Sequence, residues 1–124
     1  MIYLIDSSSW IEFFRGNPEY AFIIDLINSN TICTNDIILA ELLPSIYFRK
    51  EYKLANLLKS IRKYSLKINW GEICQIQILN LKNGNNHIGI SDIVIYQNCI
   101  QNNLKLISHD KHFKAMEKYF PKVP

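Results

Sequence analysis

The sequence predicts an α/β fold, in which a short central parallel sheet is flanked by helices on both faces. Short apolar runs alternate with longer helical patterns along the chain, and this order is typical of strand–helix–strand units. A chain of 124 residues is long enough for one domain and too short for two. No internal repeat or linker interrupts the pattern, so residues 1–124 are predicted to form a single domain.

The first strand and the first helix have clear sequence boundaries. Residues 2–5 are an apolar run that ends at Asp6, a pattern typical of a buried parallel strand. The serines at 7–9 can cap a helix, because a side-chain oxygen there accepts a hydrogen bond from a free backbone N–H group. The helix starts near Trp10, and the Gly-Asn-Pro sequence at 16–18 ends it.

The remaining elements follow from the same two kinds of pattern. Short apolar or β-branched runs predict three more strands, over residues 31–34, 66–69 and 104–108. Amphipathic or capped stretches predict helices over residues 19–28, 36–48 (capped by Asn35), 51–64, 70–82 and 92–101 (capped by Ser91), and a last helix that opens at Asp110. Residues 84–90 are predicted to be a loop.

Four carboxylates fall where the predicted strands end or the predicted helices begin. Asp6 ends the first strand, and Glu41 lies in the second turn of the helix after the second strand. Asp92 opens the helix before the fourth strand, and Asp110 follows that strand. Ligands of open α/β sheets bind beyond the carboxyl ends of the strands, where the strand order reverses. We expect the loop at 84–90 to bring Asp92 to this edge beside the other three.

Carboxylates that lie close together repel one another, and their pKa values rise unless a cation neutralises them. A ligand set made only of oxygens suits Mg²⁺ or Mn²⁺. Such an ion activates water and stabilises the charge that develops on a phosphodiester under attack. The four acids therefore predict a metal-dependent phosphodiesterase.

A simpler explanation exists for single members of this set. Aspartate is common at helix N-termini, where it caps N–H groups and interacts favourably with the helix dipole, and this alone explains Asp92 or Asp110. Glu41 is harder to explain in this way, because it interrupts an apolar run at 37–43. His109 and His112 have a spacing compatible with transition-metal binding, but no further nitrogen or sulfur ligand is evident, so we interpret them as surface or phosphate-contacting residues.

Composition limits the location of the protein more than its activity. The net charge of +3 permits binding to nucleic acid without demonstrating it. Cys33, Cys74 and Cys99 form no C-x-x-C pair and lie in apolar stretches, which predicts buried free thiols in a reducing compartment. The N-terminus lacks the basic region of a signal peptide, and no apolar run approaches the roughly 18 residues that cross a bilayer. We expect a soluble cytoplasmic protein.

The same residues resemble the motifs of PIN-domain ribonucleases, most closely the VapC toxins, over essentially the whole chain. Residues 3–8 are similar to the family's apolar strand followed by Asp and Ser or Thr, and residues 35–43 to its Ala-Glu-Leu helix. Residues 91–95 occupy the place of its third acid, and residues 106–113 resemble its strand, Ser or Thr, x, Asp, x, x, Phe ending. Four motifs in the right order and spacing make the resemblance fairly specific.

The resemblance implies an endoribonuclease that hydrolyses phosphodiester bonds as the toxin of a type II toxin–antitoxin pair. It implies Mg²⁺ or Mn²⁺ as cofactor, an RNA substrate, a small antitoxin protein that occludes the site, and a homodimer. The acids implied to be both metal-binding and catalytic are Asp6, Glu41, Asp92 and Asp110, and Ser108 is implied to orient the site. The apolar stripes between residues 19 and 64 predict that this region supplies most of the dimer contacts.

Three features depart from the family pattern. Pro44 removes the hydrogen bond to the Ala40 carbonyl and predicts a kink that re-aims Glu41. Residues 93–95 are bulkier than the small residues common at that place in the family. The segment 120–124 leaves little room for the family's final strand.

Other functions remain open on the sequence alone. A PIN nuclease that processes RNA without a toxin role would carry the same residues, and a small antitoxin-like reading frame immediately upstream would distinguish the two. A receiver-like signalling domain also gathers acids around Mg²⁺, but it needs a Lys at the end of a later strand, where this chain has Ser108 and His109. A catalytically silent binding module would have no need of all four acids.

Overall fold

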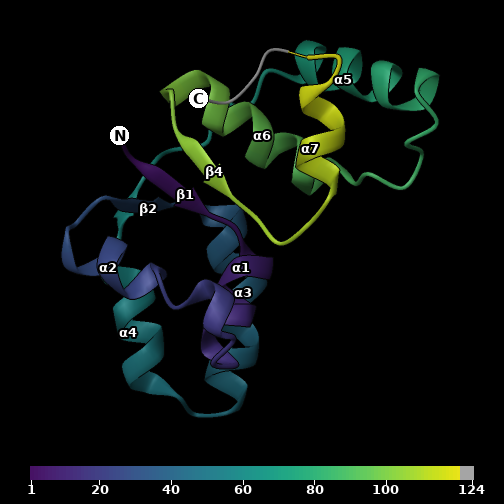
Figure 1. The fold of residues 1–124 in the computed structure, drawn as a ribbon. Coiled ribbons are helices and arrows are strands. Elements are labelled where there is room, and N and C mark those ends of the chain that lie inside the picture. The colour runs from purple at the N-terminus through teal and green to yellow at the C-terminus, as the bar shows by residue number, and fades with distance from the viewer. Residues whose placement is uncertain (121–124) are drawn as a thin grey trace.

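The computed structural model describes residues 1–120, with a four-stranded parallel sheet at its centre (Figure 1). The strands lie in the order β3-β2-β1-β4 and comprise β1 (Tyr3–Ile5), β2 (Ile32–Thr34), β3 (Arg62–Lys63) and β4 (Lys105–Ile107). Because β4 pairs with β1 on the side away from β2, the strand order reverses between β1 and β4. The carboxyl ends of these two strands therefore form the switch point, the usual ligand site of such sheets.

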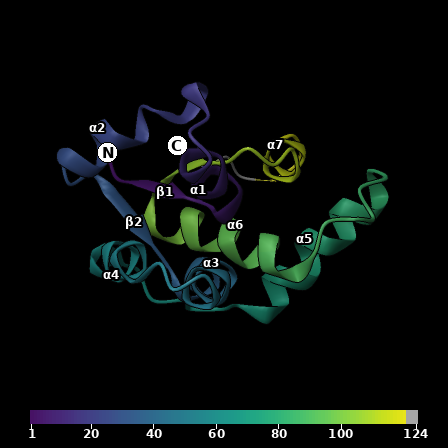
Figure 2. The same ribbon diagram turned by 90° about the horizontal axis from the view of Figure 1, so that it is seen from below.

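Helices cover both faces of the sheet. They comprise α1 (Ser7–Phe14), the 3₁₀ helix η1 (Pro18–Tyr20), α2 (Ile23–Asn28), α3 (Asp36–Phe48), α4 (Tyr52–Ser60), α5 (Trp70–Lys82), α6 (Ile90–Asn102) and α7 (His112–Glu117). In Figure 1, α1, α2, α3 and α4 lie below the labelled strands and α5, α6 and α7 lie above them, and Figure 2 shows the same helices from below. The predicted α/β fold with a parallel sheet and helices on both faces is thus confirmed.

Helix α6 anchors the core, since all its residues from 93 to 99 are buried. Two of these residues are polar, and their side chains form hydrogen bonds with neighbouring segments. The side-chain carbonyl of Asn98 accepts a hydrogen bond from Asn35 (3.1 Å), and its amide donates to the carbonyl of Ser65 (3.2 Å). Asn35 also caps α3 by accepting from the backbone N–H of Ile38 (3.0 Å). The bond between the two asparagines therefore fixes the start of α3 against α6, and these helices carry Glu41 and Asp92.

Several element boundaries differ from those that the sequence predicts. The third strand lies at residues 62–63 rather than 66–69, and the helix predicted over 51–64 ends at Ser60. The helix predicted over 19–28 divides into η1 and α2. Helix α6 begins at Ile90 with Gly89 at its N-cap, so Ser91 is not the cap. Residues 121–124, which leave little room for the family's final strand, lie outside the described residues.

One side-chain prediction is corrected as well. Cys33 and Cys99 are buried free thiols as expected, but Cys74 is exposed, because it lies on the outer face of α5. Helix α3 runs from Asp36 through Pro44 to Phe48, the bounds that the sequence predicts. Within residues 1–120, no helix has the length and apolar character that crossing a membrane requires.

Candidate active site

Asp6 directly follows β1 at the switch point, and its buried carboxylate accepts hydrogen bonds from three donors. Its Oδ1 accepts hydrogen bonds from Ser8 Oγ (2.8 Å) and from the backbone N–H of Ser9 (3.2 Å), and the second bond makes Asp6 the N-cap of α1. Its Oδ2 accepts from Ser108 Oγ (2.8 Å). Burial raises the pKa of Asp6 above its usual value, the three donors oppose this rise, and the nearby charge of Asp110 adds to it.

Ser108 connects the end of β4 to two of the acids. Its hydroxyl donates to Asp6 and accepts a hydrogen bond from the backbone N–H of Asp110 (2.9 Å). The side chain therefore fixes the loop that carries Asp110 relative to Asp6. This is the geometry that an orienting residue requires.

Glu41 approaches the same edge from α3. Its Oε1 accepts a hydrogen bond from Ser7 Oγ (3.2 Å) in the first turn of α1, and α1 packs against α3. Glu41 is exposed, so it is not the buried acid that its apolar sequence neighbours suggest. The surrounding protein nevertheless raises its pKa, chiefly by desolvation, and the charges of Asp92 and Asp6 raise it further. Glu41 thus lies within electrostatic reach of the other acids despite Pro44.

Asp92 and Asp110 meet around His112. Asp92 lies in the first turn of α6, Asp110 lies in the loop after β4, and His112 is the first residue of α7. His112 Nδ1 lies 2.7 Å from Asp92 Oδ2 and 3.3 Å from Asp110 Oδ1. One ligand atom from each of the three residues falls within 4.8 Å of the other two, so the group can hold a metal ion.

Sequence reasoning missed His112 because it treated His109 and His112 as one helical pair. Helix α7 begins at His112, so His109 lies in the preceding loop and its ring points elsewhere. His109 Nδ1 is hydrogen-bonded to the hydroxyl of Tyr20 (2.7 Å), whereas His112 contacts the acids and packs edge-on against His87. The signal available in the sequence was the position of His112 two residues after Asp110.

The structure brings the four acids to one edge of the sheet. Asp92 and Asp110 share a side-chain cluster, and Ser108 ties Asp110 to Asp6. Among residues 1–120, no Lys or Arg forms an ion pair with any of the four acids. No Lys or Arg in this part of the chain therefore neutralises the negative charge of the four acids, and a bound cation can do so. Carboxylate oxygens are ligands that suit a divalent ion.

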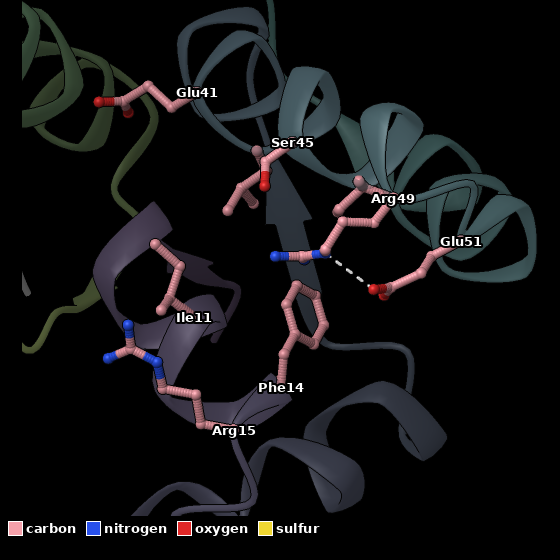
Figure 3. A pocket seen from close by; sticks show the side chains of 9 residues that line it. Ile11, Phe14, Arg15, Glu41, Ser45, Arg49 and Glu51 are labelled. Atoms are coloured by element: carbon pink, nitrogen blue, oxygen red, sulfur yellow. Dashed lines mark hydrogen bonds and ion pairs between the residues drawn. The ribbon is translucent and has the colours of Figure 1, made fainter.

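A pocket of about 520 Å³ borders this acidic edge between α1 and α3 (Figure 3). Glu41 lies at one end of it, and the ion pair of Arg49 with Glu51 (2.8 Å) lies at the other. The remaining lining residues are mostly apolar and comprise Ile11, Phe14, Leu42 and Ile46, with Arg15 and Ser45. Because Glu41 is the only one of the four acids in its lining, the pocket adjoins the acidic cluster rather than containing it.

Known structures share this fold over nearly the whole chain. VapBC2 from Rickettsia felis, bound to a DNA fragment from its promoter, matches with a TM-score of 0.72 at 21% identity and covers 98% of this chain and 94% of the other. DNA-bound VapBC from Salmonella typhimurium gives a TM-score of 0.73 at 15% identity, with 99% and 95% covered. VapC20 from Mycobacterium tuberculosis, a sarcin–ricin loop cleaving toxin, gives 0.61 at 13% identity, with 91% and 93% covered.

The sequence comparisons give one significant result. No curated protein sequence matches the chain significantly. The profile of the PIN domain, in contrast, matches residues 3–119 and leaves the receiver-like interpretation without support. The chain belongs to the PIN-domain family.

Proposed function

We propose that this protein is an endoribonuclease that depends on Mg²⁺ or Mn²⁺ and acts as the toxin of a type II toxin–antitoxin pair. The observation that carries the proposal is the convergence of four carboxylates at the switch point of the sheet without a Lys or Arg partner among the described residues. The pKa values of Asp6 and Glu41 are raised, which is the direction expected of clustered carboxylates that a bound cation would stabilise.

Each acid has a distinct part in this proposal. Asp92 and Asp110 offer oxygens at the centre of the cluster, and Asp6 is a ligand whose orientation is fixed by its three donors. Glu41, on the more open side, is suited to complete the site or to orient the attacking water. When bound, the ion supplies a polarised water and neutralises charge on the phosphodiester.

Removal of the metal is expected to abolish cleavage. The purified chain should cut single-stranded or looped RNA in Mg²⁺ or Mn²⁺, lose this activity in EDTA, and regain it when Mg²⁺ is restored in excess. The reason is that the acidic cluster cannot approach a phosphate closely while its own charge is uncompensated. Products are read on denaturing gels, and unchanged cleavage in EDTA would contradict the mechanism.

The toxin role rests on the VapBC likeness and on the pocket beside Glu41. Its apolar lining, flanked by Arg15 and Arg49, fits a segment of a small antitoxin that carries apolar side chains and acidic groups. A segment bound there would cover the open side of the acidic cluster. A small upstream gene whose product co-purifies with this chain and inhibits cleavage is the expected finding, whereas a lone gene favours a role in RNA processing.

We further propose a homodimer formed largely by residues 19–64. Large apolar side chains stay exposed there, including Phe48 (87% exposed) and Tyr52 (56%). Light scattering at tens of micromolar, roughly the range of ordinary dimer affinities, should give a dimer. Phe48→Asp should shift it towards the monomer, and the control Ile78→Asp, at a residue of α5 that is 51% exposed, should not. A monomeric wild-type chain would refute this assembly.

A further inference from the structure

We infer that His112 is a nitrogen ligand of the metal centre, which makes the site a mixed nitrogen–oxygen site that favours Mn²⁺ over Mg²⁺. The inference rests on the proposed function, because it concerns the same site. It goes further by adding a ligand to the four acids and by choosing between the two ions. Carboxylate oxygens alone accept either ion, but an imidazole nitrogen favours transition metals.

The distances around His112 match a single coordination sphere. Adjacent ligands of an octahedral ion with bonds near 2.1 Å are separated by about 3 Å. His112 Nδ1 lies 2.7 Å from Asp92 Oδ2 and 3.3 Å from Asp110 Oδ1, and all three atoms fall within 4.8 Å of one another. An ion placed among these three atoms needs only small movements of the side chains.

The ring of His112 is held in this orientation by its surroundings. The backbone N–H of His112 donates to Asp110 Oδ1 (3.0 Å), which fixes the start of α7 against that carboxylate. The ring of His87 packs edge-on against it, with centroids 4.9 Å apart. The side chain of His112 is only 24% exposed. A ligand fixed before binding loses little conformational entropy when the ion arrives.

His109 is a matched control within the same segment. It is also a histidine near Asp110, but its side chain is 53% exposed and its Nδ1 is hydrogen-bonded to Tyr20. Asn is a suitable replacement at both positions, because its amide group lies close to where Nδ1 of histidine lies. The amide keeps a hydrogen bond to the carboxylates but does not supply an imidazole nitrogen to a metal.

The experiment binds Mn²⁺ to the full-length chain without RNA and follows it by electron paramagnetic resonance. Wild type and His109→Asn should show coupling of Mn²⁺ to a ¹⁴N nucleus, and His112→Asn should lose it. Mn²⁺ affinity should fall at least tenfold in His112→Asn, while Mg²⁺ affinity measured by competition stays within about threefold. Labelling histidine with ¹⁵N in the wild type should change the coupling, a test that does not depend on how a variant folds.

The outcomes separate this inference from the proposed function. Mn²⁺ bound without nitrogen coupling, or with coupling unchanged by histidine labelling or in His112→Asn, overturns the inference and leaves the metal-dependent nuclease intact. Equal loss of Mg²⁺ and Mn²⁺ affinity in His112→Asn also overturns it, since His112 would then only position the acids. A wild-type chain that binds neither ion overturns both.

Discussion

Asp6→Asn is expected to lower RNA cleavage at least a hundredfold while leaving the metal-free protein no less stable. A hundredfold loss corresponds to about 2.7 kcal/mol of transition-state stabilisation. The variant removes one negative charge from the acidic cluster, so the site binds its cation more weakly. Its side chain is nearly isosteric with Asp, so the packing at the end of β1 is retained.

The hydrogen bonds around Asp6 can adapt to the amide. Asn caps a helix about as well as Asp, so the bond from the Ser9 N–H group survives. In the wild type, the hydroxyl of Ser108 donates a hydrogen bond to Asp6 Oδ2. In the variant, the same hydroxyl can instead accept a hydrogen bond from the side-chain amide of Asn. Desolvation of the carboxylate and its repulsion from Asp110 are removed at the same time. Stability in EDTA should therefore be equal to or higher than that of the wild type.

The pH dependence provides an internal check on this expectation. The pKa of Asp6 is higher in the folded state than in the unfolded chain, so the folded state binds more protons in the interval between the two values. Stability contributed by this group is therefore lost as pH rises through that interval. The thermal midpoint of Asp6→Asn should exceed that of wild type most at neutral pH, and the difference should shrink on acidification. All midpoints are measured in EDTA by circular dichroism.

Near-normal cleavage by Asp6→Asn would leave Asp6 with its capping role alone. Loss of cleavage that merely follows unfolding would lead to the same conclusion. Glu41→Gln provides a second case, because the pKa of Glu41 is also raised and its partner Ser7 can bond to an amide. Its activity should fall as well.

The sequence correctly predicts the elements in which the pattern of apolar residues reflects burial in the core. The helix predicted over residues 70–82 is observed as α5 with the same bounds, and the strand at Tyr3–Ile5 lies at the centre of the sheet. The third strand was misplaced because β3 is an edge strand made of two exposed cations, Arg62 and Lys63. Edge strands often carry charge, and the apolar residues at 66–69 pack against the core from an irregular segment.

The candidate site was less predictable than the fold. Strand ends in a parallel sheet converge by topology, so the positions of Asp6 and Asp110 could be expected from the order of the elements. Asp92 and His112 depend on where α6 and α7 begin, and single-sequence patterns fix such boundaries to within a few residues only. The last helix begins at His112, two residues later than the sequence predicts, and His112 contacts Asp92.

The last prediction tests whether Asp92 belongs to the site or only stabilises its helix. Asp36 and Asp92 both lie in the first turn of a helix of 13 residues, so the helix dipole favours them alike. Asp36 is exposed and pairs with Lys63 (3.1 Å), whereas Asp92 contacts His112 (2.7 Å). Asp92→Asn should lower cleavage at least a hundredfold, and Asp36→Asn should leave it within about twofold.

Stability separates the two explanations further. The dipole contribution of an acid in the first turn is about 0.3–1 kcal/mol, so both variants should unfold in EDTA within a few degrees of the wild type. A structural role alone would therefore make Asp92→Asn and Asp36→Asn indistinguishable in cleavage as well as in thermal midpoint. If Asp92 is a metal ligand, Asp92→Asn should lose affinity for Mn²⁺ and Asp36→Asn should not. The reason is that the carboxylate of Asp92, unlike that of Asp36, lies close to His112 and Asp110. Equal activity of the two variants would assign Asp92 to the helix and remove it from the proposed centre.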